Sequence, residues 1–141
     1  MMLYVDTSAL IKRYVDEDGS DRVNALWDGA TGIATSVVAF AETIATLNRK
    51  LREGVLSNRE YSRTVMSFKS DYRRVILVSI NAGLNERIET LARNHVLRGF
   101  DAIHLASALV IQNKGKMETG FACYDRALNE AAVKEGLPAV I

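Results

Sequence analysis

Four acidic side chains lie where the sequence pattern places strand ends or helix starts, and they are Asp6, Glu42, Asp101 and Asp125. Asp6 is the clearest of them, because it directly follows the short apolar run 3–5, which is typical of a buried strand. Thr7 and Ser8 come next, and an apolar-periodic segment typical of a helix begins at Ala9. In parallel α/β proteins, ligands bind where strands end in this way. Asp6 is therefore a candidate ligand or catalytic carboxylate.

The other three acids are expected at the same edge of a parallel sheet. Asp125 follows the apolar run 121–124, which we predict to be the fourth strand. Glu42 lies in the second turn of the helix expected after the run 33–36, so its side chain can reach that edge. Asp101 opens the helix that leads back to the fourth strand, and this helix must begin where the strands end. Four carboxylates from distant parts of the sequence are thus predicted to share one crevice.

A crevice with four carboxylates predicts a divalent cation. Carboxylates within about 6 Å of one another raise each other's pKa, which makes such a cluster costly as a purely structural arrangement. Because all the ligand atoms would be oxygens, Mg²⁺ is the expected cofactor, with Mn²⁺ as a substitute. Such an ion generates a hydroxide nucleophile and stabilises charge on a phosphoryl oxygen. Thr7 or Ser8 would orient a carboxylate or a metal-bound water.

The elements that position these acids alternate between strands and helices. Short apolar runs predict strands at 3–5, 33–36, 75–78, 121–124 and 139–141, the last at an edge because Pro138 precedes it. Apolar residues at helical spacing predict helices at 9–15, 20–29, 37–52, 57–68, 84–91, 101–113 and 126–135, and Ser57 with Glu60 forms a capping box. This order predicts a three-layer α/β/α sandwich around a central, mostly parallel twisted sheet of about five strands.

Length and composition indicate one ordinary globular domain, residues 1–141. The chain of 141 residues is 48% hydrophobic and 25% charged, and it contains no apolar stretch of the roughly 20 residues that a membrane helix needs. A lone Cys123 and the lack of a signal-peptide pattern indicate a cytoplasmic protein without membrane contact. The net charge of +1 is too small to predict nucleic-acid binding by itself. With four acids set around a metal, however, the rest of the surface would be positive and could attract a polyanion.

The order of the motifs resembles that of the PIN-domain nucleases, and more narrowly of the VapC-like toxins of toxin-antitoxin pairs. The segments that carry the resemblance are Tyr4-Val5-Asp6-Thr7-Ser8-Ala9-Leu10, Ala41-Glu42, Phe100-Asp101-Ala102 with Leu105-Ala106 and Ala108, and Tyr124-Asp125 with Leu128. The resemblance runs from Leu3 to Gly136. One departure is Cys123, because this family often has a hydroxyl-bearing residue two positions before the fourth acid.

The resemblance implies a metal-dependent endoribonuclease that hydrolyses RNA phosphodiesters. It also implies a homodimer, and inhibition by a cognate antitoxin protein whose tail occupies the groove beside the acids. Position by position, the residues that match the family's acidic set are Asp6, Glu42, Asp101 and Asp125, with Thr7 or Ser8 as the accompanying hydroxyl. We therefore expect Asp6, Asp101 and Asp125 to hold the metal, and Glu42 to bind the metal or orient its water.

Simpler interpretations apply to several of these residues. Asp6, Asp101 and Asp125 each begin a predicted helix, and Asp is a preferred N-cap, a role that is compatible with metal binding. His104 lies one turn after Asp101, and the simpler interpretation is a helix histidine that contacts its neighbours rather than substrate. The simpler interpretation of the basic residues is that most of them lie on solvent-exposed helix faces. The candidates for RNA contact are Lys12 and Arg13, whose helix starts at the acidic crevice, and Ser8.

Three other functional classes compete with a nuclease. A receiver-like phosphoacceptor needs an Asp at the end of the third strand, where this chain has Ser79-Ile80-Asn81. A haloacid-dehalogenase-type phosphatase needs a second Asp two residues after the first, and that position is Ser8. The stronger alternative is a non-catalytic PIN-like module that binds RNA or a partner protein without turnover. Metal binding distinguishes it from an enzyme, because a scaffold should bind little Mn²⁺.

Overall fold

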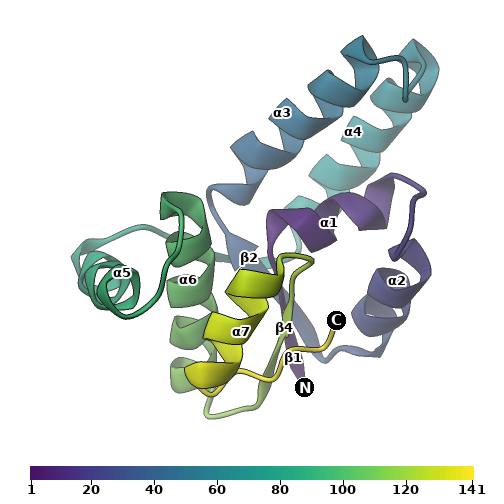
Figure 1. Cartoon of the computed structure of the whole chain (residues 1–141). Helices are drawn as coiled ribbons and strands as arrows, with labels where there is room; N and C mark the ends of the chain where they lie inside the picture. Colours follow the sequence, from purple (N-terminus) through teal and green to yellow (C-terminus); the bar gives the residue numbers. More distant parts are fainter.

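The computed structural model describes residues 1–141 and contains one parallel sheet of four strands in the order β3-β2-β1-β4 (Figure 1). The strands are β1 (Met2–Val5), β2 (Gly32–Ser36), β3 (Ile76–Val78) and β4 (Thr119–Ala122). In the central pairs, Tyr4 of β1 is aligned with Ala34 of β2 and with Phe121 of β4. All strands therefore end at the same edge, which confirms the parallel arrangement predicted for the sheet.

The strand predicted at 139–141 is reduced to one bridge at the free edge of β4. Ala139 pairs with Phe121 in parallel, the Phe121 N–H donates to the Pro138 carbonyl, and the Val140 N–H donates to the Phe121 carbonyl. The segment thus lies where the sequence predicts it. Pro138 has no N–H to add to the ladder, so the pairing does not extend into a regular strand.

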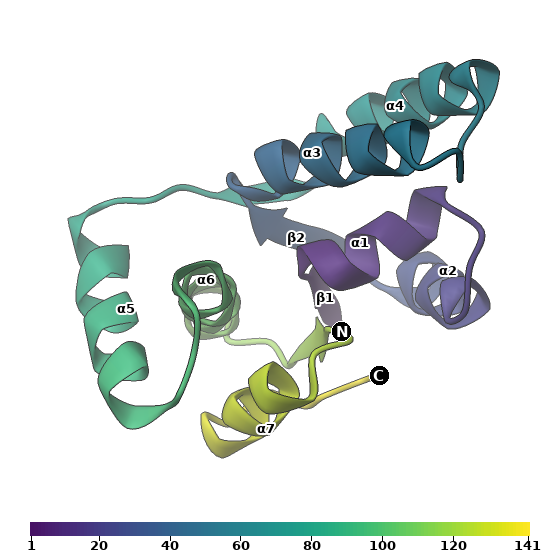
Figure 2. The same ribbon diagram turned by 45° about the horizontal axis from the view of Figure 1, so that its top comes forward.

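Seven helices cover the two faces of the sheet (Figure 2). On one face lie α1 (Thr7–Tyr14), α2 (Ser20–Gly29), α3 (Ala39–Arg52) and α4 (Asn58–Tyr72); on the other lie α5 (Ala82–Asn94), α6 (Gly99–Gly115) and α7 (Arg126–Lys134). The side chains of β1 alternate between these layers, because successive residues of a strand point to opposite faces. Leu3 and Val5 pack with the first group of helices, whereas Tyr4 packs with the second. None of the seven helices combines the length and apolarity that crossing a membrane requires.

Helices α3 and α4 extend beyond the sheet as an antiparallel arm (Figure 1). The capping box predicted from the sequence starts α4, since Ser57 Oγ accepts from the Glu60 N–H and the Glu60 carboxylate accepts from the Ser57 N–H. Phe68 of α4 is fully buried against the core below α1. The base of the arm is therefore fixed to the domain.

Two element boundaries differ from those that the sequence predicts near the acids. Strand β4 ends at Ala122, two residues earlier than expected, so Cys123 and Tyr124 form a short connection to Asp125. Helix α6 begins at Gly99, so Asp101 lies in its first turn and Arg98 occupies the cap position. The N-cap role predicted for Asp101 is therefore wrong, since the sequence pattern carried no signal for the extra turn. Those predicted for Asp6 and Asp125 are confirmed.

Candidate active site at the carboxyl edge of the sheet

Asp6 connects the end of β1 to the start of α1 and is nearly buried, with 6% of its surface exposed. Its Oδ1 accepts hydrogen bonds from the Ser8 hydroxyl at 2.7 Å and from the Ala9 N–H at 3.0 Å. Burial raises the pKa of the Asp6 carboxyl, although its interaction with His104 and these two hydrogen bonds act in the opposite direction. Asp6 is thus a helix cap and also a desolvated carboxylate at the end of the central strand.

Glu42 is held in place by two donors from other elements. The Thr7 hydroxyl donates to Glu42 Oε1 at 2.7 Å, and His104 Nε2 lies 2.8 Å from the same oxygen. Burial alone would raise the pKa of Glu42, but the hydrogen bonds from His104 and Thr7 outweigh it, so the pKa lies below its usual value. Glu42 therefore stays ionised and keeps one orientation beside the start of α1.

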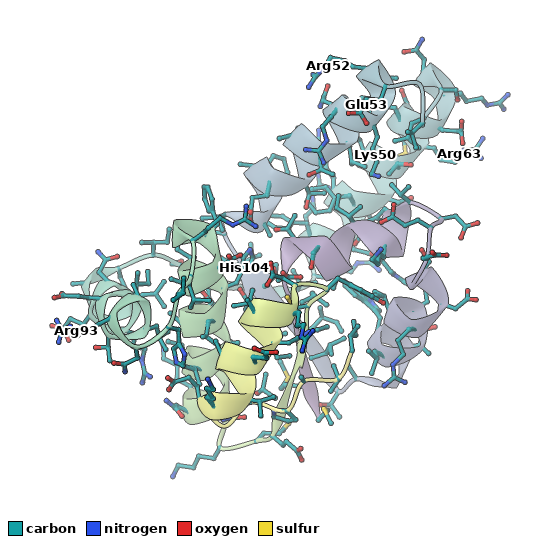
Figure 3. The ribbon with its side chains drawn as sticks, viewed as in Figure 1. Lys50, Arg52, Glu53, Arg63, Arg93 and His104 are labelled. Atoms are coloured by element: carbon teal, nitrogen blue, oxygen red, sulfur yellow. The ribbon has the colours of Figure 1, made fainter.

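His104 links this carboxylate to the core of the sheet. It extends from α6 toward the start of α1 (Figure 3), and only 2% of its surface is exposed. An ionised carboxylate only accepts hydrogen bonds, so His104 Nε2 carries a proton and donates the hydrogen bond to Glu42. In the neutral ring, Nδ1 then accepts from the Tyr4 hydroxyl at 2.8 Å. The simpler interpretation of His104 is confirmed, because it contacts neighbours in the fold, but those neighbours include a predicted site residue.

Asp101 and Asp125 approach each other through a shared arginine. Arg98 Nε lies 3.6 Å from Asp101 Oδ2, and Arg98 Nη2 lies 4.0 Å from Asp125 Oδ2. The Arg98 side chain is 86% exposed, whereas those of Asp101 and Asp125 are 23% and 37% exposed. Arg98 thus acts as a flexible counter-ion between two carboxylates that come from different helices.

The connection between β4 and α7 is fixed by Ser8 and Cys123. Ser8 Oγ accepts from the Tyr124 N–H at 2.9 Å while it donates to Asp6, so one hydroxyl joins the first and fourth acidic positions. The Cys123 thiol accepts from the Asp125 N–H at 3.1 Å and donates to the Asp125 carbonyl at 3.6 Å. Sulfur thus makes these hydrogen bonds at the position where the family often has a hydroxyl. Burial raises the pKa of this thiol, which keeps it protonated.

The carboxylates lie at one edge of the sheet but are not drawn together around one point. No three Asp, Glu, His or Cys side chains are close enough to hold a metal ion as they stand. The chemistry of the donor set nevertheless suits Mg²⁺ or Mn²⁺, because the four acids offer oxygen atoms only. Arg98 is also the one Lys or Arg side chain that pairs with any of them, and its exposure leaves it free to move away. These residues therefore fit a divalent cation.

The basic residues proposed for RNA contact both have protein partners. Lys12 Nζ lies 3.2 Å from Glu17 Oε1 and sits over the Tyr124 ring, 4.5 Å from its centroid. Arg13 points toward α2 and α4, where it bonds Asn24, lies 3.9 Å from an Asp71 oxygen and stacks on Trp27. Lys12 thus stays beside the acidic edge, whereas Arg13 is occupied by contacts between helices.

Sequence reasoning did not single out Tyr4 or Arg98. Tyr4 reads as an ordinary strand residue, and no sequence pattern pairs it with a histidine 100 positions later. Arg98 offers a usable signal, because a basic residue three positions before Asp101 lies beside it once both are near the start of one helix. Its contact with Asp125 depends on the packing of α6 against α7 and follows from the fold alone.

A comparison with known families gives the class of this protein. The PIN domain matches residues 3–133, which is most of the chain. The protein therefore belongs to the PIN domain family, in agreement with the parallel sheet and the order of the acidic motifs.

Within that family, the chain is related to VapC ribonucleases along nearly its whole length. Ribonuclease VapC45 of Mycobacterium tuberculosis (strain CDC 1551 / Oshkosh) and Ribonuclease VapC49 of the same species (strain ATCC 25618 / H37Rv) are each 33% identical to it over 135 residues. The match covers 96% of this chain and 92% of either relative.

Solved structures of toxins share the fold. VapC20 of Mycobacterium tuberculosis, described as a sarcin-ricin loop cleaving toxin, superposes with a TM-score of 0.65 at 22% identity, and the match covers 92% of this chain and 94% of that one. VapBC2 from Rickettsia felis, bound to a DNA fragment from its promoter, gives a TM-score of 0.62 at 12% identity, with 93% of each chain covered. At these identities the likeness extends to the fold alone.

Proposed function

We propose that this protein is a metal-dependent endoribonuclease and the toxin of a toxin-antitoxin pair. The curated relatives named above are ribonucleases, and solved toxin-antitoxin complexes share its fold. The observation that carries the proposal is that side chains at this edge of the sheet link three of the acids, while Thr7, the neighbour of Asp6 in the chain, bonds Glu42. Asp6 and the Asp125 loop share Ser8, while Asp101 and Asp125 share Arg98.

The residues that would hold Mg²⁺ or Mn²⁺ are Asp6, Asp101 and Asp125, with Glu42 as a further ligand or as the group that orients water. A bound divalent cation would lower the pKa of its bound water, so that hydroxide forms near neutral pH, and would neutralise charge that develops on a phosphoryl oxygen. The chain's own residues supply orientation. Ser8 and the Ala9 N–H fix the Asp6 carboxylate, and Thr7 with His104 fixes Glu42 in its ionised form.

Arg98 has a second role in this proposal. Its guanidinium is exposed and lies beside two of the acids, so it can contact an RNA phosphate once those acids bind a cation. In the free protein, Arg98 would balance the charges of Asp101 and Asp125. When the cation binds these acids, Arg98 would turn to the RNA and leave the site open. Arg98 is therefore a candidate for binding the substrate backbone rather than for proton transfer.

The partners of the protein follow from the same proposal. RNA is the substrate, and a cognate antitoxin covers the groove beside the acids. The homodimer and the cytoplasmic location stay predictions, which sedimentation of the pure protein and cell fractionation test directly.

The direct test of the proposed function is the substitution Asp6→Asn. Asparagine retains the N-cap of α1 but removes a charged ligand, so we expect metal-dependent RNA cleavage to fall by at least about a hundredfold while the circular dichroism spectrum stays unchanged. Cleavage of a labelled single-stranded RNA in the presence of Mg²⁺ or Mn²⁺ measures this. The exposed Asp16→Asn is the matched control and should retain activity. Full activity of Asp6→Asn would remove the mechanism, and an inactive wild-type chain would favour the non-catalytic module.

The toxin assignment has its own test in cells. Expression of the chain should arrest growth, and co-expression of the neighbouring small open reading frame should relieve the arrest. The Asp6→Asn variant should not arrest growth. Normal growth with the wild-type chain at the same expression level would contradict the toxin assignment.

A further inference from the structure

A small basic pocket adjoins the acidic edge between α1 and α3. It has a volume of about 340 Å³, and Thr7 and Ser8 line it together with the basic residues Lys12, Arg49 and Lys50. The same two hydroxyls contact Glu42 and Asp6. The pocket is thus continuous with the candidate active site rather than a separate feature of the surface.

Glu17 lies between the two lysines of this pocket. Lys12 Nζ is 3.2 Å from Glu17 Oε1, and Lys50 Nζ is 3.2 Å from Glu17 Oε2. The Lys50 side chain lies on the side of the arm that faces α1, as Figure 3 shows. The side chains of Lys12 and Lys50 are only 15% and 18% exposed, so both ammonium groups are partly desolvated. Two lysines therefore converge on a single anionic group inside the pocket.

The positive charge of the pocket exceeds what Glu17 neutralises. Arg49 is exposed, also lines the pocket and pairs with no carboxylate of the chain. Lys12 is fixed further by a hydrogen bond of 2.7 Å to the Asp18 carbonyl and by its position over the Tyr124 ring. Two lysines held in place and an exposed arginine give a surplus of positive charge that suits a phosphate group, since a phosphate accepts several charge-assisted hydrogen bonds at once.

We propose that this pocket binds a backbone phosphate of the RNA next to the one that is cleaved, and that Glu17 occupies the place of that phosphate in the free protein. The inference rests on the proposed ribonuclease function. RNA is favoured over an acidic peptide because the hydroxyls of Thr7 and Ser8 connect the pocket to the acids that would hold the metal. One polyanion can therefore occupy both places. Glu17 then competes with the RNA phosphate for the two lysines. RNA must displace Glu17 to bind, so Glu17 weakens RNA binding.

RNA binding in the absence of cleavage tests the proposal. A fluorescein-labelled single-stranded RNA of mixed sequence is titrated with protein in EDTA, and its anisotropy is followed at several NaCl concentrations. We expect Arg49→Ala and Lys12→Gln each to weaken binding about fivefold and to lower the slope of log Kd against log [NaCl] by about 0.7. The control Arg63→Ala removes the same charge at the far end of the arm (Figure 3) and should change Kd less than twofold.

The substitution Glu17→Gln separates this role from a structural one. If Glu17 stands in for a phosphate, its neutral variant should bind RNA about fivefold more tightly, because the lysines lose their competing anion. If Glu17 only ties α1 to α3, Glu17→Gln should lower the melting temperature and leave the Kd for RNA unchanged. That result would overturn the proposal. The proposal also fails if Arg49→Ala, which breaks no ion pair, binds RNA as well as Arg63→Ala does.

Two further results separate this inference from the function on which it rests. Wild-type protein that cleaves RNA while all pocket variants bind RNA normally would overturn the pocket but keep the ribonuclease. Pocket variants that lose affinity for the purified antitoxin but not for RNA would assign the pocket to that protein and likewise overturn the proposal. A wild-type chain that cleaves no RNA would instead remove the proposed function.

Discussion

At the scale of the residue, Asp6 combines properties that stability alone would not favour. A carboxylate with 6% exposure loses most of its hydration, and burial raises its pKa. Its two hydrogen-bond donors, Ser8 and the Ala9 N–H, would serve an asparagine equally well. The contacts of Asp6 in the fold therefore do not require its charge, which agrees with the metal-binding role proposed above.

The burial of the Asp6 carboxylate predicts how the stability of the fold depends on pH. Because the pKa of folded Asp6 lies above the unfolded value near 3.8, the ionised group destabilises the fold at neutral pH, and this cost disappears as pH falls toward 3.8. In EDTA at pH 7, Asp6→Asn should be more stable than wild type, because asparagine removes the buried charge. The difference should shrink toward pH 4.

Urea unfolding at the two pH values measures this difference. The exposed Asp16→Asn is a control for the change in net charge and should show little effect at either pH. A wild-type protein that is the more stable of the two at pH 7 without metal would show that the Asp6 charge supports the fold.

At the scale of the element, one buried chain of hydrogen bonds ties the strand layer to two helices. Tyr4 of β1 contacts His104 of α6, and His104 contacts Glu42 of α3. Tyr4 also stacks on Phe121 of β4, with ring centroids 5.8 Å apart. The position of Glu42 is thus set by the packing of three elements, not by its own helix alone.

Removal of the Tyr4 hydroxyl should therefore affect activity as well as stability. In Tyr4→Phe, the buried Nδ1 of His104 loses its hydrogen-bond donor, which should cost about 1–3 kcal/mol and hold the imidazole beside Glu42 less firmly. We expect RNA cleavage to fall severalfold in kcat. Chemical denaturation and single-turnover cleavage measure the two effects.

Tyr14→Phe is the matched control for this prediction. The Tyr14 hydroxyl donates to Asp71 at 3.1 Å, away from the acids, so its loss should lower stability without lowering kcat. Equal activity of the Tyr4 and Tyr14 variants at a temperature where both are folded would limit the Tyr4 hydroxyl to a structural role.

At the scale of the whole molecule, the parallel sheet brings together residues from both ends of the sequence. Asp6 and Asp125 are separated by most of the chain, yet Ser8 and the Tyr124 N–H join their loops at 2.9 Å. The acids belong to α1, α3, α6 and the start of α7, which cover both faces of the sheet. A ligand bound among them would link the two helical layers.

Metal binding should for this reason stabilise the whole domain. At a concentration of about one hundred times its Kd, an ion that binds only the folded state adds about 2.7 kcal/mol. We expect Mn²⁺ to raise the melting temperature of wild-type protein by several degrees, and EDTA to reverse the increase. Differential scanning calorimetry measures both.

The variants Asp6→Asn and Asp101→Asn should lose most of this gain, whereas Asp16→Asn should keep it. An equal rise in all of them would indicate weak binding to the general surface instead of a site at the edge of the sheet.

The sequence by itself determined the class of fold and the edge at which the acids lie. Apolar runs and helical periodicity depend on local burial, and the acids at strand ends follow from chain direction in a parallel sheet. Asp6 and Asp125 also have the N-cap roles that their positions predict, because capping involves only neighbouring residues. Local rules were sufficient for these features.

The tertiary structure alone decided which side chains meet. Contacts such as Tyr4 with His104, Arg98 with Asp125, and Lys12 and Lys50 with Glu17 join segments whose separation in sequence has no period. They depend on how helices pack across the sheet, and packing is set by the shape of the whole core. The same reason explains why Arg13, which begins near the acids in sequence, is turned toward α2 and α4 instead.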